Sequence, residues 1–194
     1  MQNTDLSKWG WNDKVKGYTR PDTLDEYVFK EIKSSYKHLE IGEGDIVLDI
    51  GANIGAFSKY ALEKGAHRVY AYEPEPENYE LFVINTHPDF FTIGAGQILR
   101  VKSAVVGTNE TEIELYINSK KNKGLHMTRP VRGREGVTVR AENFGKILHN
   151  RQPNKVKIDV EGAEKILISE LIKANFLINT KSIFVETKKQ NLIL

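Results

Sequence analysis

Cysteine is absent from the 194-residue sequence, which excludes disulfides, zinc sites built on thiolates and a cysteine nucleophile. No run of about 18 apolar residues occurs, so the sequence predicts no transmembrane helix. Residues 1–11 also lack the apolar core of a secretory signal peptide. From these absences we expect a cytoplasmic protein. Hydrophobic residues make up 40% of the chain and the net charge is only +2, which indicates one folded domain and excludes wholesale disorder.

A basic segment over residues 119–140 departs from this near-neutral balance. It contains seven lysines and arginines against one acid, Glu135: Lys120, Lys121, Lys123, Arg129, Arg132, Arg134 and Arg140. Such a segment could contact an anionic partner such as nucleic acid, or it could be a solvated loop. The near-neutral charge of the whole chain argues against a dedicated nucleic-acid binder.

Strand and helix patterns alternate along the chain after residue 23. We expect strands at 45–49, 68–72, within 97–106, 155–159 and 182–186, and helices at 24–38, 57–64, 77–85, 142–149 and 163–175. Segments 111–117 and 136–140 alternate apolar and polar residues, as half-exposed strands do. This order predicts an α/β fold with a mostly parallel sheet and helices on both faces.

The domain division follows from the N-terminal composition. Residues 1–22 show no clear period but contain two tryptophans, a tyrosine and a proline, so we expect an extension packed on a domain that spans residues 23–194.

In the helix over 163–175, the spacing places four residues on the buried face: Ile166, Leu167, Leu171 and Ile172.

Four acids end proposed strands, namely Asp49, Glu73, Asp159 and Glu186. Since ligands of such sheets bind outside the carboxyl ends of the strands, these carboxylates should surround the binding crevice. They are accompanied by a turn over residues 51–55, whose candidate ligand-binding residues are Gly51, Ala52, Asn53 and Gly55.

The spacing of this turn does not match the dinucleotide fingerprint, and Asn53 is a residue type that tolerates positive φ. An acid just before the loop, Asp49, suits an amino group rather than a diphosphate. Glu73, followed by Pro74, could accept hydrogen bonds from both hydroxyls of a ribose. Together they point to S-adenosylmethionine, whereas the alternative is a plain strand-to-helix turn with a solvated acid at position 73.

Three segments carry a family resemblance: Val-Leu-Asp-Ile-Gly-Ala-Asn-Ile-Gly-Ala-Phe-Ser at 47–58, Tyr-Ala-Tyr-Glu-Pro-Glu-Pro-Glu-Asn at 70–78 and Val-Lys-Ile-Asp-Val-Glu-Gly-Ala-Glu at 156–164. They resemble the signature blocks of FkbM-type S-adenosylmethionine-dependent methyltransferases of the class I superfamily. Residues 182–186 look like the closing strand of that domain and residues 23–27 like the stretch before it. The resemblance implies a Rossmann-like class I fold and O-methylation of hydroxyl groups, commonly on sugars.

Methyl transfer to a hydroxyl requires that its proton be removed, and Asp159 is our first candidate for the base or for a residue that orients the acceptor. It also contributes to the expected cofactor site. Glu161 could share the catalytic role or bind a divalent cation with Asp159. Alternatively, Asp159 caps the following helix, and Glu161 and Glu164 are acids that favour its first turn. The five histidines lack metal-ligand spacing, so we expect no histidine metal site.

The remaining candidates lie on connections. Ser103 and Ala104 follow the third strand, where class I folds usually supply adenine contacts. For substrate binding we consider Arg129, which could hold the acceptor; Glu186, which could instead pair with Lys188; and His126, which could act as a base or lie on the surface.

The sequence thus predicts an O-methyltransferase with a sugar, glycan or small hydroxylated acceptor. A nucleic-acid ribose methyltransferase and a binding module without turnover are the alternatives. Only eight residues follow Glu186, which are too few for the strand hairpin that normally completes a class I sheet. We therefore expect that hairpin to be missing: either the chain is a trimmed or excised domain, or the strands at 111–117 and 136–140, or a partner chain, cover the exposed edge.

Overall fold

The computed structural model describes residues 6–88, 96–118, 126–128, 130–160, 162–173, 182–186 and 192–193. Its main sheet contains six strands: β3 (Ile46–Ile50), β4 (Arg68–Tyr72), β5 (Gln97–Val101), β9 (Lys155–Ile158), β10 (Ser182–Val185) and β11 (Leu192–Ile193). Their order is β11-β10-β9-β3-β4-β5, and all pairs except β10 with β11 are parallel. The chain order reverses between β3 and β9, which makes their carboxyl ends the expected ligand crevice.

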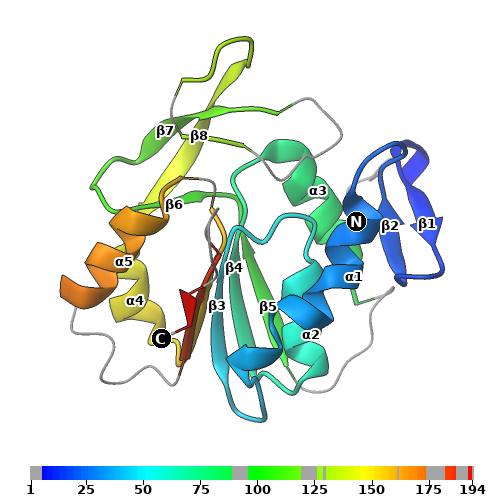
Figure 1. Ribbon diagram of the computed structural model, residues 1–194, viewed down its shortest axis with the longest axis horizontal. Coiled ribbons are helices and arrows are strands. Elements are labelled where there is room, and N and C mark those ends of the chain that lie inside the picture. Colours follow the sequence, from blue (N-terminus) through cyan, green and yellow to red (C-terminus); the bar gives the residue numbers. More distant parts are fainter. Residues whose placement is uncertain are drawn as a thin grey trace.

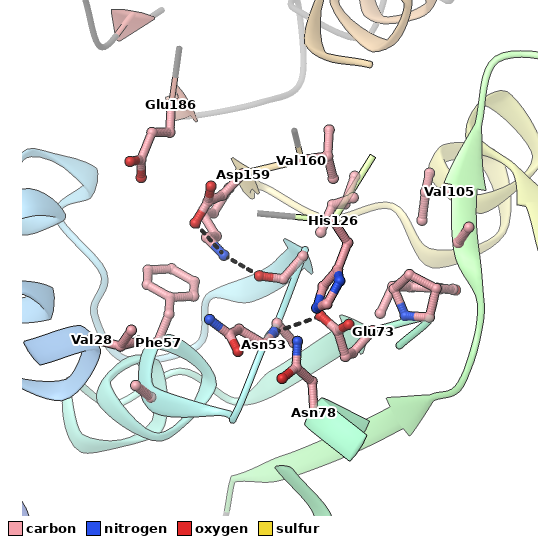
Figure 2. Close-up of a pocket in the computed structure, with 18 of the residues that line it drawn as sticks. Val28, Asn53, Phe57, Glu73, Asn78, Val105, His126, Asp159, Val160 and Glu186 are labelled. Atoms are coloured by element: carbon pink, nitrogen blue, oxygen red, sulfur yellow. Dashed lines mark hydrogen bonds and ion pairs between the residues drawn. The ribbon is translucent and has the colours of Figure 1, made fainter. Parts of the chain in front are cut away.

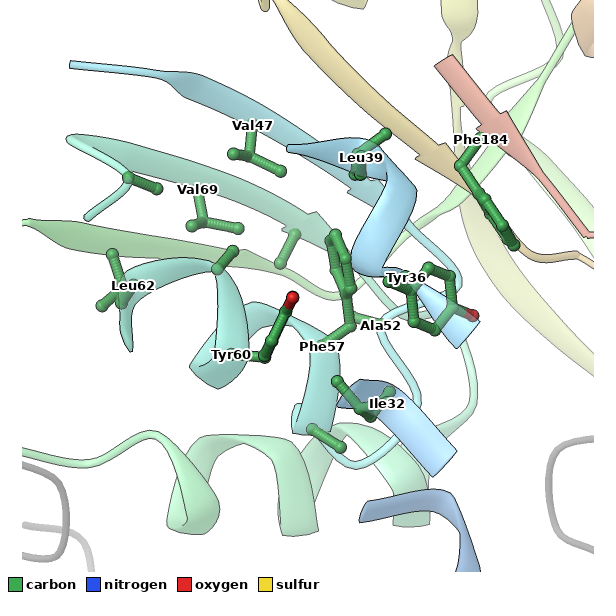
Figure 3. Close-up of a cluster of buried hydrophobic side chains, with 14 of the residues drawn as sticks. Ile32, Tyr36, Leu39, Val47, Ala52, Phe57, Tyr60, Leu62, Val69 and Phe184 are labelled. Carbon is green, nitrogen blue, oxygen red and sulfur yellow. The ribbon is translucent and has the colours of Figure 1, made fainter. Parts of the chain in front are cut away.

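Helices cover both faces of this sheet (Figure 1). On one face lie α1 (Asp25–Ser35), α2 (Ala56–Glu63) and α3 (Pro76–Asn85), with the short 3-10 helix η2 (Lys37–Leu39), and on the other lie α4 (Phe144–Arg151) and α5 (Glu164–Lys173). Successive β3 residues point to opposite faces, so Val47 packs with Phe57 of α2 while Leu48 packs with Phe144 of α4. Figure 3 shows the first of these two clusters. The predicted α/β fold is confirmed.

The small sheet lies apart from the main one and contains β6 (Ala104–Val106), β7 (Glu112–Tyr116) and β8 (Gly136–Asn143), in the order β6-β8-β7. Ala104, Leu115, Val139 and Ala141 form its apolar cluster. The segment 97–106 thus holds two strands in different sheets. The expectation that 111–117 and 136–140 cover the edge of the main sheet is wrong, because these strands pair with each other. At that edge, β11 pairs antiparallel with β10.

Helix α5 departs from its predicted buried face at two positions. Leu167 and Leu171 are fully buried, but Ile166 and Ile172 are 55% and 60% exposed. Residues four apart share one side of a helix, whereas Ile166 and Ile172 are each displaced by about 100° from the leucine stripe. The strip that faces the sheet is therefore narrower than the apolar sequence indicated.

The N-terminal residues contribute η1 (Leu6–Lys8) and a hairpin of β1 (Gly10–Asn12) and β2 (Gly17–Thr19). Trp9 packs with Leu81 and Ile84 of α3. The buried guanidinium of Arg20 donates two hydrogen bonds to Asp25, through Nε (2.9 Å) and Nη2 (2.8 Å). Residues 6–20 are therefore held against α1 and α3, while the domain boundary at residue 22 stays a prediction.

Candidate active site

A cavity of about 340 Å³ opens at the carboxyl ends of β3, β4 and β9. Its size is that of a small-molecule binding site. Helix α1 forms one wall, and the loops after β3, β4, β5 and β9 form much of the rest, together with Leu115 of β7, His126 and Glu186. Figure 2 shows Asp159 and Glu186 toward one end of this cavity and Glu73 toward the other.

The loop after β3 depends on glycine at its first position. Gly51 has a φ of 82°, and a Cβ there would lie 1.9 Å from the carbonyl oxygen of Asp159. Asn53 also adopts a positive φ, 50°, a conformation that asparagine tolerates. Gly51, Ala52 and Asn53 line the cavity. Gly55 does not, because it precedes α2 as its N-cap residue and lies against Phe82, whose ring would be 2.5 Å from an added Cβ.

Glu73 stands at the end of β4 with its carboxyl group buried. Its Oε2 accepts a hydrogen bond from the backbone N–H of Asn53 (2.8 Å), and its Oε1 accepts one from Glu75 (2.9 Å). Burial raises the pKa of Glu73 to about 7, although these two backbone donors act in the opposite direction. Each carboxyl oxygen retains a lone pair for a ligand that donates hydrogen bonds.

Asp49 lies behind the cavity rather than on its wall. Its side chain is fully buried, accepts a 2.6 Å hydrogen bond from Ser58 Oγ, and forms a 3.1 Å ion pair with Lys157 Nζ. Lys157 also donates to the carbonyl oxygen of Gly51 at 2.6 Å. Burial alone would lower the pKa of Lys157, but Asp49 and Asp159 outweigh burial and raise it. The lysine therefore stays charged and links Asp49 to the glycine loop.

Asp159 and Glu186 are joined through Tyr36, the residue that follows α1. The Tyr36 hydroxyl lies 3.2 Å from Oδ2 of Asp159 and 3.1 Å from Oε2 of Glu186. Lys157 Nζ is 3.4 Å from the same Oδ2 of Asp159. Burial and the charge of Asp159 raise the pKa of Glu186. These contacts engage the side chain of Asp159, and α5 begins only at Glu164, so capping of that helix does not account for Asp159.

The other described candidates also line the cavity: Pro74, Ser103, Ala104 and His126. Ser103 and His126 are buried, so His126 is not the surface histidine that the sequence allowed. Its Nδ1 accepts a 3.0 Å hydrogen bond from the backbone N–H of Asn118, which places the proton of a neutral imidazole on Nε2. The orientation of His126 is thus set by the chain after β7.

Two candidates, Glu161 and Arg129, lie outside the described residues. So do Lys120, Lys121 and Lys123 of the basic segment, and Lys188, the suggested partner of Glu186. Within the described ranges, no group of three histidine or acidic side chains could hold a metal ion. None of the described helices has both the length and the apolar character that a membrane crossing requires.

Several residues of the cavity were not singled out from the sequence, and among them Tyr36 and Lys157 contact Asp159. The sequence predicted a helix over 24–38 but gave no reason to bring Tyr36 to Asp159. Lys157 did carry a signal, because a lysine between Val156 and Ile158 in a buried strand requires a nearby opposite charge.

The chain is similar to a known protein family in sequence and to solved structures in fold. The profile of the Methyltransferase FkbM domain matches residues 49–191, whereas no curated protein matches the sequence. Among solved structures, methyltransferase FkbM from Methylobacillus flagellatus is 14% identical, with a TM-score of 0.48 over 81% of this chain and 36% of that chain. A precorrin-8w decarboxylase from Methanobacterium thermoautotrophicum is 14% identical, with a TM-score of 0.42 over 92% of this chain and 68% of that chain.

Proposed function

Because the chain belongs to the FkbM methyltransferase family, we propose that it transfers a methyl group from S-adenosylmethionine to a hydroxyl of a sugar or glycan. The cavity at the carboxyl ends of β3, β4 and β9 carries this proposal, since it combines a glycine loop, a buried acid and a more exposed acid. We retain a cytoplasmic location as part of the proposal.

The cavity residues fit this cofactor. The carboxyl of Glu73 has lone pairs that can accept hydrogen bonds from ribose hydroxyls. Asn53 Oδ1 is a buried acceptor for which no donor exists among the described residues, and a ligand can provide one. Gly51 itself lines the cavity, and its missing side chain lets the loop lie directly against the backbone of Asp159. The adenine base of the cofactor would lie against the loops that follow β4 and β5. There it would contact Pro74, Ser103 and Ala104.

Asp49 enters the proposal indirectly. Lys157 neutralises Asp49 and donates to Gly51, so these two residues hold the cofactor loop in place. The negative charge expected to attract the amino group of the cofactor is therefore shared with a buried cation. We propose that Asp49 shapes the site through Lys157 and Gly51.

The bound cofactor supplies the methyl group and its sulfonium leaving group. The protein has to orient the acceptor hydroxyl and remove its proton. Asp159 is suited to both tasks because its side chain is 37% exposed at the cavity and its carboxylate is stabilised by Lys157. Glu186 and His126 flank the same space and can position the acceptor.

The outer wall of the cavity supports a sugar as the acceptor. Tyr27 of α1 lines the cavity yet is 60% exposed, and Glu31 lies one turn further along the same helix. An exposed aromatic ring beside a carboxylate can contact both the apolar face and the hydroxyls of a sugar.

Two measurements test the proposed function. Calorimetric titration with S-adenosylmethionine should show binding to the native protein and to Tyr60→Phe, and strong loss in Asp49→Ala/Glu73→Ala. Tyr60 is a suitable control because it belongs to the core next to α1 but does not line the cavity. Absence of binding to the native protein would refute the assignment, as would unchanged binding to the double variant.

The acceptor is tested with methyl-labelled cofactor and a panel of glycans, nucleotide sugars and RNA. We expect label in a carbohydrate. Label in RNA, with binding that falls steeply with salt, would instead establish the ribose methyltransferase alternative.

A further inference from the structure

Tyr36 is the point at which two acids distant in sequence meet. Its ring is buried between Phe57 and Phe184, with ring-centre distances of 4.8 and 4.7 Å. Its hydroxyl extends beyond these rings to Asp159 Oδ2 and Glu186 Oε2, at 3.2 and 3.1 Å. The packed ring fixes the hydroxyl between the two carboxyl groups.

The Tyr36 hydroxyl does not carry enough protons to donate a hydrogen bond to each of two ionised acids. A tyrosine hydroxyl has one proton and can donate one hydrogen bond, while its oxygen can accept another. Burial and the adjacent acids raise the pKa of Tyr36, so the hydroxyl itself stays protonated. For both contacts to be hydrogen bonds, one carboxyl group must be protonated and must donate to the Tyr36 oxygen.

The surrounding charges distinguish the two acids. Lys157, held by Asp49, forms a 3.4 Å ion pair with the oxygen of Asp159 that faces Tyr36, so Asp159 has a cation beside it. Burial is the largest cause that raises the pKa of Glu186, and the charges of Asp159 and, from α1, of Glu31 act in the same direction. Lys157, and Tyr36 where its hydroxyl donates to the ionised carboxylate, lower this pKa, but the net direction is upward.

We propose that Tyr36 is a positioning residue that joins Asp159 and Glu186 into one hydrogen-bonded unit with a single extra proton. In this unit, the protonated Glu186 carboxyl donates to the Tyr36 oxygen, and the Tyr36 hydroxyl donates to ionised Asp159. Tyr36 and Lys157 both donate to Oδ2 of Asp159. Within the described part of the chain no group donates a hydrogen bond to Oδ1 of Asp159. On the proposed function, Oδ1 is therefore the atom that receives the proton of the hydroxyl group that is methylated.

Carboxyl carbon NMR tests this arrangement without cofactor or methyl acceptor. The probe is the δ-carbon of Glu186 in ¹³C-labelled protein, assigned by its loss in Glu186→Gln. In the native protein we expect Glu186 to titrate above the ordinary pKa of a glutamic acid. In Tyr36→Phe the pKa should fall by about one pH unit, because the protonated carboxyl loses its acceptor.

The opposite hydrogen-bond direction makes the opposite prediction. If Tyr36 donated to ionised Glu186, Tyr36→Phe would raise the pKa of Glu186, and this result would overturn the proposal. An ordinary pKa for Glu186 in the native protein would overturn it too, and that titration does not depend on whether Tyr36→Phe folds.

Tyr60→Phe serves as the matched control, because it removes a hydroxyl from the same buried cluster without touching either acid. It should leave the titration of Glu186 unchanged, and an equal shift in this control would refute the specific role of Tyr36. Failure of S-adenosylhomocysteine to bind would count against the proposed function but would leave the NMR result for Tyr36 intact.

Discussion

Replacement of Glu73 by glutamine gives the sharpest test of the cofactor site. The native carboxyl is buried, is held by two backbone donors and has a pKa of about 7. Ribose hydroxyls would donate to the ionised form, so affinity should rise as the pH increases through 7. Glu73→Gln keeps the shape of the side chain but removes its charge and one of its two acceptors.

The expected magnitudes follow from this pKa. About one tenth of Glu73 is ionised at pH 6 and about nine tenths at pH 8, so cofactor should bind the native protein about tenfold more weakly at pH 6. Hydrogen bonds to a charged group contribute about 1.5–3 kcal/mol. Glu73→Gln should therefore bind about ten- to a hundredfold more weakly than the native protein at pH 8 and lose most of the pH dependence.

Isothermal titration with S-adenosylhomocysteine between pH 6 and pH 8.5 measures both effects. Glu80→Gln is the matched control, because Glu80 is exposed on α3 and does not line the cavity. It should bind as the native protein does. Native affinity that is independent of pH, or unchanged affinity in Glu73→Gln at pH 8, would refute the reasoning.

Four further outcomes are expected. The raised pKa of Glu73 stabilises the free protein below pH 4.5, and this contribution of about 3 kcal/mol is lost as the pH rises through 7. The free energy of unfolding of the native protein, measured with denaturant, should fall by this amount, whereas that of Glu73→Gln should not. Lys157→Met should lower the free energy of unfolding by about 3–5 kcal/mol because it leaves Asp49 buried without a cation, and added Asp49→Asn should restore part of it. Gly51→Ala should cost about 3 kcal/mol or more in the same assay. Asp159→Asn should keep cofactor binding by calorimetry but reduce labelled methyl transfer about 10²- to 10⁴-fold.

Each of these outcomes has its own contradiction. Equal unfolding free energies of the native protein at pH 5 and pH 8 would argue against the raised pKa of buried Glu73. If the Lys157→Met/Asp49→Asn variant recovered no stability, the loss in Lys157→Met would not come from an unpaired Asp49. Gly42→Ala is the control for Gly51, because an added Cβ there meets no atom within 4 Å, so equal losses would deny the close approach to Asp159. Near-native turnover of Asp159→Asn would remove Asp159 as the base.

The sequence was informative where the determining interactions are local. Alternating apolar runs and glycine breaks located the parallel strands, and the acids at the strand ends do surround the cavity, apart from Asp49 behind its wall. Residue type also indicated which positions could adopt a positive φ, because few side chains tolerate that backbone conformation, and Gly51 and Asn53 do adopt it.

Other features required the tertiary structure. The apolar content of α5 could not show which residues face the sheet, because Ile166 and Leu167 are chemically alike and only docking selects between them. Likewise, the alternation in 111–117 is the same whether the strand pairs with the main sheet or with β8. Periodicity reports that a face is buried but not against what.

The sequence by itself determined the fold class, the family and the acids at the strand ends, since these depend on patterns within short segments. Only the tertiary structure decided how those acids are used. It placed Lys157 between Asp49 and Asp159, and it placed Tyr36 between two acids that lie 123 and 150 residues further along the chain. Such contacts depend on how helix α1 docks on the sheet, which is set by the packing of the whole core and not by any one segment.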